Sequence, residues 1–138
     1  MSVVAVYTPD REGAAALLHA VPEAGLRRTE LLVLGMAATD RSQEAESLLV
    51  EARSLAAEAG IELSLLPADD RDLADQVIDA SYEDEVAAVV VGTRRRSPVG
   101  KMFLGGLAQR IVLEAHCPVV VVKLPAGPAG APSSRAER

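Results

Sequence analysis

Short apolar runs alternate along the chain with stretches of helical periodicity. The runs cover residues 3–6, 31–34, 61–66, 87–91 and 119–122, and most of them are nearly unbroken Val, Leu or Ala. Between the runs, apolar side chains recur at three- and four-residue spacing, which predicts helices with one buried face. Strands that are apolar throughout are buried on both faces, as in a parallel sheet covered by helices. The pattern therefore predicts the α/β class and a three-layer α/β/α sandwich.

The expected helices have recognisable ends in the sequence. Thr8 can cap the first helix, which we expect to continue to about residue 20. Gly60 follows the second periodic stretch, at the position where a C-terminal glycine is favoured. Apolar positions within residues 73–78 and 103–115 predict two further helices.

Composition and charge narrow the classes of function. A chain of 138 residues with 49% hydrophobic residues is expected to fold as one domain. The net charge of −6 disfavours a nucleic-acid binder, because phosphate contacts need clustered Lys and Arg. Arg94, Arg95 and Arg96 form the one basic run, which is too small for such an interface.

The N-terminal residues, the length of the apolar runs and the cysteine content predict the cellular compartment. Residues 1–10 lack the basic and apolar regions of a signal peptide, and no apolar stretch approaches the ~20 residues needed to span a membrane. The single Cys117 cannot form an internal disulfide. We therefore expect a reduced, soluble cytoplasmic protein. Its folded domain is expected to cover residues 1–123, and residues 124–138, rich in Pro, Gly, Ala and Ser, to form a flexible tail.

The most informative segment is residues 89–122, VVVGTRRRSPVGKMFLGGLAQRIVLEAHCPVVVV. An apolar run ends at Gly92, a basic loop follows, and Gly105 and Gly106 precede a helical stretch and a second apolar run. This segment resembles the universal stress protein family of the UspA type, whose members carry a Gly-x-x-Gly-(nine residues)-Gly-(Ser/Thr) phosphate loop here. The match runs without a gap through the closing Cys-Pro-Val-Val-Val-Val.

The resemblance implies both a topology and a ligand. It implies a five-stranded parallel sheet of order 3-2-1-4-5, of the adenine nucleotide alpha-hydrolase-like type. Strand order then reverses between the first and fourth strands, where α/β sheets bind ligands. The implied ligand is an adenine nucleotide, ATP or AMP. The positions that would bind it are Thr8, Met36, Val91, Gly92, Arg95, Gly105, Gly106 and Leu107.

Several of these positions depart from the family pattern. Arg95 stands where the second glycine belongs, and Gly106 stands where the hydroxyl belongs. Neither Tyr7 nor Thr8 supplies the acid that usually ends the first strand. We therefore expect a degenerate nucleotide site, with binding weakened or lost. A guanidinium at Arg95 can also pair with phosphate, which would replace lost contacts.

Other interpretations of the same loop remain open. The basic run 94–96 can be a solvated surface, or the rim of a crevice that takes a different small anion. Gly105 and Gly106 are also compatible with close packing at a helix start.

The sequence favours a binding module over an enzyme. No Gly-x-Ser-x-Gly or Walker sequence occurs, and no general base stands near the loop. A slow ATPase or another nucleotide-dependent enzyme using the same loop is the alternative. His19 and His116 are interpreted as helix C-terminal residues, and the chain has too few His and Cys for a metal site. The acidic residues in 69–75 are interpreted as the start of a helix.

The last apolar run predicts an assembly. In the implied strand order, Val119, Val120, Val121 and Val122 form an edge strand, which must be covered or paired. The resemblance implies a homodimer formed through this strand, and the alternative is an edge masked by the tail. The expected function is that of a dimeric stress-response regulatory module, with protein partners that the sequence does not name.

Overall fold

The computed structural model describes residues 1–36, 42–67, 69–94 and 104–124. Strands and helices alternate throughout, as the sequence predicted. They are β1 (Ser2–Val6), α1 (Arg11–Arg27), β2 (Glu30–Leu34), α2 (Gln43–Ala59), β3 (Leu63–Leu65), α3 (Leu73–Ser81), β4 (Val86–Arg94), α4 (Gly106–Glu114) and β5 (Val119–Leu124).

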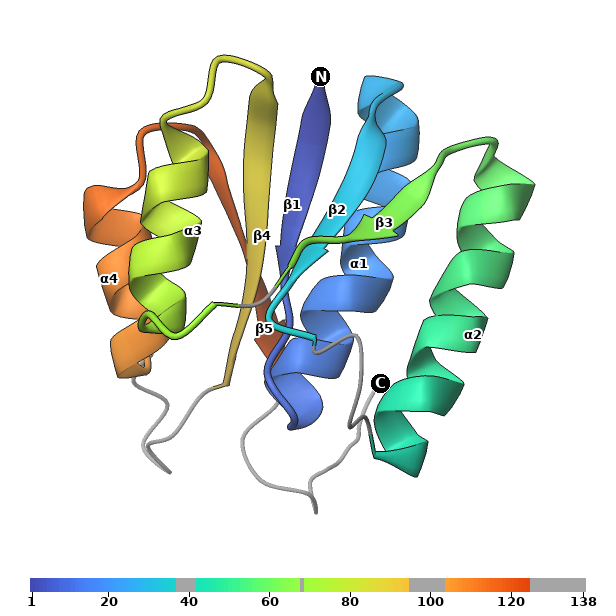
Figure 1. Cartoon of the computed structure of the whole chain (residues 1–138), viewed down its shortest axis with the longest axis horizontal. Coiled ribbons are helices and arrows are strands. Elements are labelled where there is room, and N and C mark those ends of the chain that lie inside the picture. The colour runs from blue at the N-terminus through green and yellow to red at the C-terminus, as the bar shows by residue number, and fades with distance from the viewer. Residues whose placement is uncertain (37–41, 68, 95–103, 125–138) are drawn as a thin grey trace, which may run out of the picture.

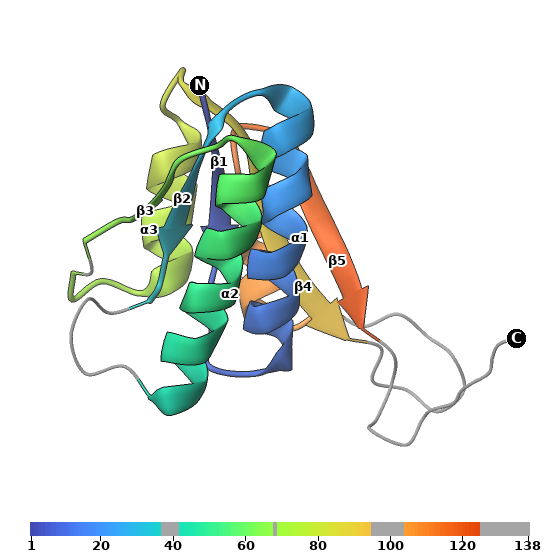
Figure 2. The same ribbon diagram turned by 90° about the vertical axis from the view of Figure 1, so that its right-hand side faces the viewer.

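The strands form one parallel sheet of order β3-β2-β1-β4-β5. Helices α1 and α2 cover one face of this sheet, and α3 and α4 cover the other (Figures 1 and 2). The predicted three-layer sandwich and its strand order are confirmed. No helix within the described ranges is long and apolar enough to cross a membrane.

Strand β1 lies at the centre of the sheet and contributes to both cores. Val3 and Ala5 pack under α1 and α2, whereas Val4 and Val6 pack under α3 and α4. All four side chains are buried, because successive strand residues point to opposite faces and both faces are covered. This explains why an unbroken apolar run was a reliable signal for the strand.

The start of α1 differs from the prediction that Thr8 caps it. Asp10 is the N-cap, and its carboxylate Oδ1 accepts hydrogen bonds from the Gly13 N–H at 2.9 Å and the Thr8 hydroxyl at 2.6 Å. An ionised carboxylate is a stronger acceptor than a hydroxyl at the positive end of a helix. Thr8 therefore supports the cap as a donor, and α1 begins at Arg11.

The end of α1 also differs from the prediction. The helix continues past residue 20 to Arg27 and contains Pro22. Ala20, Val21 and Ala24 are buried in the core that α1 shares with the sheet. Their burial stabilises the additional turns and offsets the hydrogen bond that a proline cannot donate.

The remaining boundaries follow from local hydrogen bonds. Gly60 ends α2 with φ of 74°, as predicted for a C-terminal glycine. The Ile61 N–H then donates to the Ala56 carbonyl, so β3 is shorter than the predicted run 61–66. Strand β4 extends to Arg94, and β5 extends to Leu124, one residue beyond the predicted domain boundary. Residues 125–138 of the predicted tail lie outside the described residues.

The two histidines have different surroundings. His19 lies within α1, not near its end as predicted, and its Nε2 is 3.6 Å from a Glu23 carboxylate oxygen. His116 follows α4 and stacks on Tyr82, with ring centroids 4.4 Å apart. In the acidic segment, Asp72 caps α3 by accepting the Ala74 N–H at 3.2 Å, which agrees with the predicted helix start.

Replacement of Asp10 tests the observed cap. Asp10→Ala removes the acceptor of the Gly13 N–H and is expected to lower the free energy of unfolding by about 1 kcal/mol. Thr8→Val removes only the supporting donor and is expected to lower the free energy of unfolding by less than Asp10→Ala does. Urea denaturation of both variants measures the difference. A larger loss from Thr8→Val than from Asp10→Ala would contradict the assignment of Asp10 as the cap.

Candidate functional site

The strand order places a crevice at the carboxyl ends of β1 and β4. These strands are neighbours in the sheet, but β1 continues into α1 on one face and β4 leads to α4 on the other. Ligands in open α/β sheets bind at such a reversal. Thr8 follows β1, and Gly92 lies near the end of β4, at the lower end of the strands in Figure 1.

The glycine at position 92 has a packing role. A Cβ built on Gly92 would lie 2.2 Å from the Glu12 carbonyl oxygen in the first turn of α1. No side chain tolerates that distance to a backbone atom, so a glycine allows α1 to approach β4. The presence of Gly92 is thus explained without a phosphate.

Gly105 and Gly106 lie at the start of α4 without close packing. Gly105 is the N-cap, with φ of −64° and ψ of 167°, and it offers no side-chain hydrogen bond to the helix. A Cβ built on either glycine meets no described atom within 4 Å. The described residues therefore give no support to the interpretation of these glycines as a close-packed helix start. No described residue packs against Gly105 or Gly106 in the first turn of α4, which has the positive end of the helix dipole.

The other candidate positions are mostly buried. Met36 and Val91 are buried on opposite faces of the sheet, Met36 in the core under α1 and Val91 in the core under α4. Leu107 packs at the edge of the second core. The side chains of Met36 and Val91 therefore serve packing. Arg95, together with Arg96, lies outside the described residues.

The end of β1 carries no free acid. Tyr7 is buried, and the Thr8 hydroxyl donates to Asp10, which caps α1. Burial, aided by the nearby charges of Asp10 and Glu44, raises the pKa of the Tyr7 hydroxyl above its ordinary value. Tyr7 therefore remains a neutral phenol.

A pocket of about 640 Å³ lies beside this crevice, between the first turns of α1 and α2. Tyr7, Ala14 and Leu48 line it together with Asp10, Glu44 and Glu51. The sequence did not predict this pocket, because its walls come from separate segments that only the packing of α1 on α2 brings together. The one available signal was an aromatic residue, Tyr7, in a chain with 2% aromatics.

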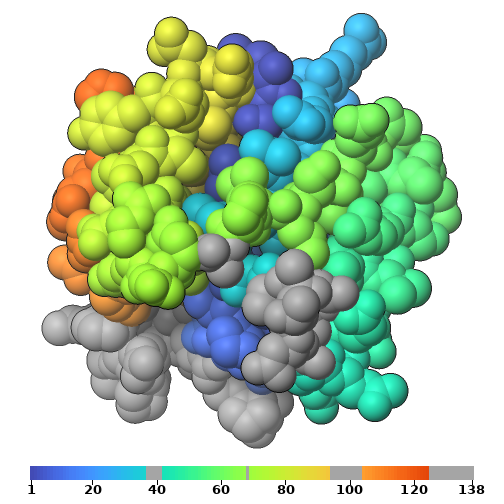
Figure 3. All heavy atoms as spheres, viewed as in Figure 1, coloured from blue at the N-terminus to red at the C-terminus, as the bar shows by residue number. Residues whose placement is uncertain are grey.

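A second hollow, of about 530 Å³, lies at the opposite ends of the strands. Val4, Leu32 and Leu66 form part of its lining, with Glu30 and Glu83 beside them. In Figure 3 this region lies between β2 and the chain that joins α3 to β4, next to the blue atoms of the N-terminal strand. It lies at the amino ends of the strands, away from the strand-order reversal, so it is not the site implied by the topology.

Metal and thiol chemistry have little support in the described residues. Those residues contain no group of three or more His, Cys, Asp or Glu side chains that could hold a metal ion. Cys117 is a half-buried free thiol, and burial raises its pKa above the ordinary value. A raised pKa lowers the thiolate fraction at neutral pH, which makes Cys117 a weak nucleophile.

Comparisons with known proteins agree with this architecture. The model of the family described as "Usp: Universal stress protein family" matches residues 68–123. A universal stress protein of Mycolicibacterium smegmatis is 31% identical over 125 residues, which cover 88% of this chain and 96% of the relative. The chain belongs to the universal stress protein family.

Solved structures of the family extend the comparison to three dimensions. A universal stress protein from Archaeoglobus fulgidus superposes with a TM-score of 0.65 and 29% identity, covering 88% of this chain and 97% of that one. A universal stress protein from the same organism in complex with dAMP gives a TM-score of 0.58 and 25% identity, covering 88% and 96%. The fold is thus the adenine nucleotide alpha-hydrolase-like fold of universal stress proteins.

The packing role of Gly92 can be tested against Gly106. Gly92→Ala places a methyl group against the Glu12 backbone and is expected to lower the free energy of unfolding by about 1–3 kcal/mol. Gly106→Ala adds the same methyl group in open space at the start of a helix. It is expected to be neutral or to stabilise by up to about 1 kcal/mol. Urea denaturation compares them, and an equal effect of both changes would refute the packing role.

Proposed function

We propose that the protein is a cytoplasmic stress-response binding module whose adenine-nucleotide site is weakened or lost. The observation that supports a site is the open first turn of α4, which Gly105 leaves without a side-chain cap. Backbone N–H groups at a helix N-terminus favour phosphate. The related Archaeoglobus fulgidus protein was solved in complex with dAMP, which makes an adenine nucleotide the first ligand to test.

The same region explains why binding is proposed to be weak. Gly106 offers a backbone N–H but no hydroxyl to a phosphate. At the end of β1, Tyr7 and Thr8 provide no carboxylate, and the Thr8 hydroxyl proton is already donated to Asp10. Each missing hydrogen bond to a ligand removes about 0.5–1.5 kcal/mol of binding free energy, so two or three losses weaken binding by about five-fold or more.

A binding role is favoured over a catalytic one. Turnover of ATP needs a base within hydrogen-bonding reach of the attacking water. In the described part of the chain, the start of α4 carries the side chains of Leu104, Leu107, Ala108 and Gln109, none of which is a general base. Asp10 is occupied as the cap of α1. We therefore propose a regulatory module rather than the alternative slow ATPase.

Calorimetric titration with AMP, ADP and ATP tests the weakened site. Wild-type protein stripped of nucleotide is expected to bind more weakly than micromolar. The Arg95→Gly, Gly106→Ser double variant is expected to bind at least about ten-fold more tightly, because it regains a loop glycine and a hydroxyl donor. The Arg95→Gly, Gly106→Ala variant is the matched control, since it carries the Cβ without the hydroxyl.

The outcomes separate the causes of weak binding. Micromolar binding by the wild type would show that the arginine loop is a working phosphate site and that the proposed weakening is wrong. If the alanine control gains as much as the serine variant, the missing hydroxyl at position 106 is not a cause. If no variant binds, the α4 site does not take adenine nucleotides.

We also propose that the protein is a homodimer paired through β5. This strand is an edge of the sheet. The Val89 N–H donates to the Pro118 carbonyl at 3.0 Å, and Val89 pairs with Val119. This parallel register directs the backbone groups of Val119 and Val121 away from β4. An apolar edge with free backbone groups needs a partner, and a second copy offers the same edge across a two-fold axis.

The surface of α4 next to this edge supports the same interface. Leu113 is 73% exposed and Val112 is also exposed, although α4 packs over the face of β5. Exposed apolar side chains beside an unpaired strand lose contact with water when a second copy pairs there. The proposed interface therefore combines strand pairing with burial of α4 side chains.

Analytical ultracentrifugation of an edge variant tests the dimer. Val121→Pro removes an N–H that points away from β4, so the fold is expected to survive while the dimer dissociates. Leu63→Pro is the matched control, because Leu63 has the corresponding outward position on the opposite edge strand β3. The wild type and the control are expected to sediment as dimers. A monomeric wild type, or a Val121→Pro dimer of unchanged affinity, would reject this interface.

A further inference from the structure

The pocket between the first turns of α1 and α2 has the features of a separate binding site. We call it the α1–α2 pocket, and its volume of about 640 Å³ falls within the usual range for small-molecule sites. Ala14 and Leu48 form apolar walls, and Tyr7 lies at the base, at the end of β1. Tyr7, at the acid position of the implied nucleotide site, lines this pocket, whereas Gly92, Gly105 and Gly106 do not.

Tyr7 supplies a buried polar group without a partner. Its side chain is only 8% exposed and lines the pocket, yet its hydroxyl makes no hydrogen bond within the described residues. Among those residues, Thr29 Oγ1 is the one fully enclosed side-chain oxygen or nitrogen atom without a partner. The Tyr7 hydroxyl is therefore not sealed in the core and opens to the pocket. Buried polar groups are normally paired, so this hydroxyl indicates a missing ligand or solvent partner.

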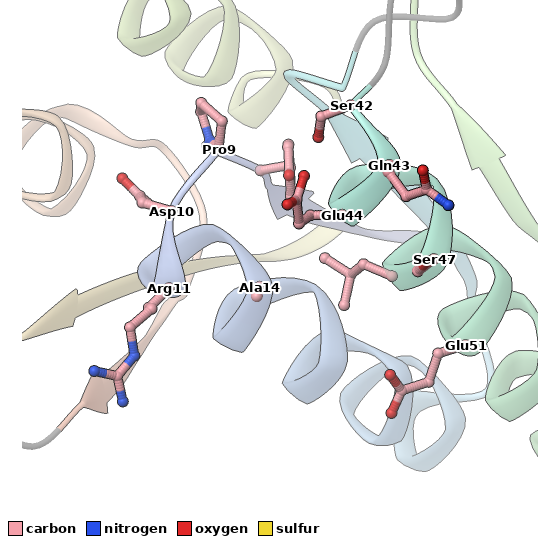
Figure 4. A pocket seen from close by; sticks show the side chains of 11 residues that line it. Pro9, Asp10, Arg11, Ala14, Ser42, Gln43, Glu44, Ser47 and Glu51 are labelled. Carbon is pink, nitrogen blue, oxygen red and sulfur yellow. The ribbon is translucent and has the colours of Figure 1, made fainter. Parts of the chain in front are cut away.

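The charges around Tyr7 are mainly negative. Among the described lining residues, Asp10, Glu44 and Glu51 are acidic and Arg11 is the one cation. Figure 4 shows the Arg11 side chain extending away from Glu44 and from the space between the helices. Asp10 and Glu44 lie close enough to Tyr7 that their charges help to raise the pKa of its hydroxyl. The potential at the pocket therefore favours a cation and opposes a phosphate.

We propose that the α1–α2 pocket binds a small organic cation, a protonated amine carried on a short apolar or aromatic frame. The ammonium group donates to the Tyr7 hydroxyl oxygen and to the Glu44 carboxylate. The frame packs against Leu48 and Ala14. Charge-assisted hydrogen bonds from the ammonium give orientation, and burial of the frame gives affinity.

This site differs from the proposed nucleotide site in both place and charge. The nucleotide site lies at the N-terminus of α4 and needs an anion, whereas the α1–α2 pocket is acidic. The two proposed sites share Tyr7 at the end of β1, and the amide shifts distinguish their ligands. An amine shifts the resonances of Tyr7, Ala14 and Leu48, whereas a nucleotide shifts those of residues 105–107.

Three probes of nearly the same shape but different charge test the proposal. Phenethylamine is a cation, 2-phenylethanol is neutral, and phenylacetate is an anion at neutral pH. Each is titrated into ¹⁵N-labelled full-length protein, and amide shifts are followed by two-dimensional NMR. With phenethylamine we expect saturable shifts at the pocket residues. We expect 2-phenylethanol to bind at least about three-fold more weakly, and phenylacetate not to bind.

Isosteric variants test the assigned contacts. Glu44→Gln and Tyr7→Phe are each expected to weaken phenethylamine binding by about three- to ten-fold. Glu44→Gln keeps an acceptor oxygen but removes its negative charge, whereas Tyr7→Phe removes the acceptor. Glu58→Gln makes the same change in net charge on α2 outside the pocket, and it is expected to leave binding unchanged. The amide spectra of the variants show that each remains folded.

Four results would each contradict the proposal. Equal binding of all three probes would show a merely apolar hollow, and tighter binding of phenylacetate would show the opposite charge preference. No saturable shift with phenethylamine up to millimolar concentration would show that the pocket is not an amine site. An equal loss of phenethylamine affinity in Glu58→Gln and Glu44→Gln would show that long-range charge attraction, and not a contact with Glu44, explains the binding.

Discussion

The first turn of α1 rests directly on the backbone at the carboxyl ends of β1 and β4. A Cβ built on Gly13 would lie 1.9 Å from the Thr8 carbonyl oxygen, and one built on Gly92 would lie 2.2 Å from the Glu12 carbonyl oxygen. Two glycines, one in the helix and one in the strand, thus allow backbone-to-backbone contact across the strand-order reversal. Any side chain at either position would push the helix away from the sheet.

This contact determines what the rest of the site can be. With α1 held so close, Asp10 must cap the helix, and its carboxylate is committed to the Gly13 N–H and the Thr8 hydroxyl. The end of β1 then offers no free acid to a ligand. The same placement of α1 against α2 leaves the pocket over Tyr7 open. One packing constraint therefore accounts both for the missing acid of the nucleotide site and for the neighbouring pocket.

Most of the fold could be predicted because buried positions are recognisable in the sequence as apolar residues. An apolar run such as residues 3–6 must be covered on both sides, which already implies a parallel sheet between helix layers. The strand order came from the family resemblance, since periodicity does not specify neighbours. Gly60 was predicted correctly, because a left-handed residue after a helix is a local property.

The candidate site could be predicted less well because its details depend on contacts between distant segments. In the sequence, Gly92 resembles a phosphate-loop glycine, and only the structure shows that it packs against the Glu12 backbone. Gly105 and Gly106 look like packing glycines, although nothing described packs there. Thr8 and Asp10 are both good caps, and only the path of the chain after β1 decides between them. These choices depend on where α1 and α4 lie on the sheet.

The two sides of the strand-order reversal have opposite electrostatic character. At α4, an open helix N-terminus without acidic residues in its first turn favours an anion. At α1 and α2, Asp10 and Glu44 occupy the first turns or caps and cancel the positive helix ends that would otherwise face a ligand. The acids that stabilise these two helices thus also make the space between them unfavourable for phosphate. Helix-end chemistry and the proposed ligand charges are therefore linked. The N-terminus of α4, without a side-chain cap, is the proposed anion side, and the ends of α1 and α2, with acidic residues in their caps or first turns, are the proposed cation side.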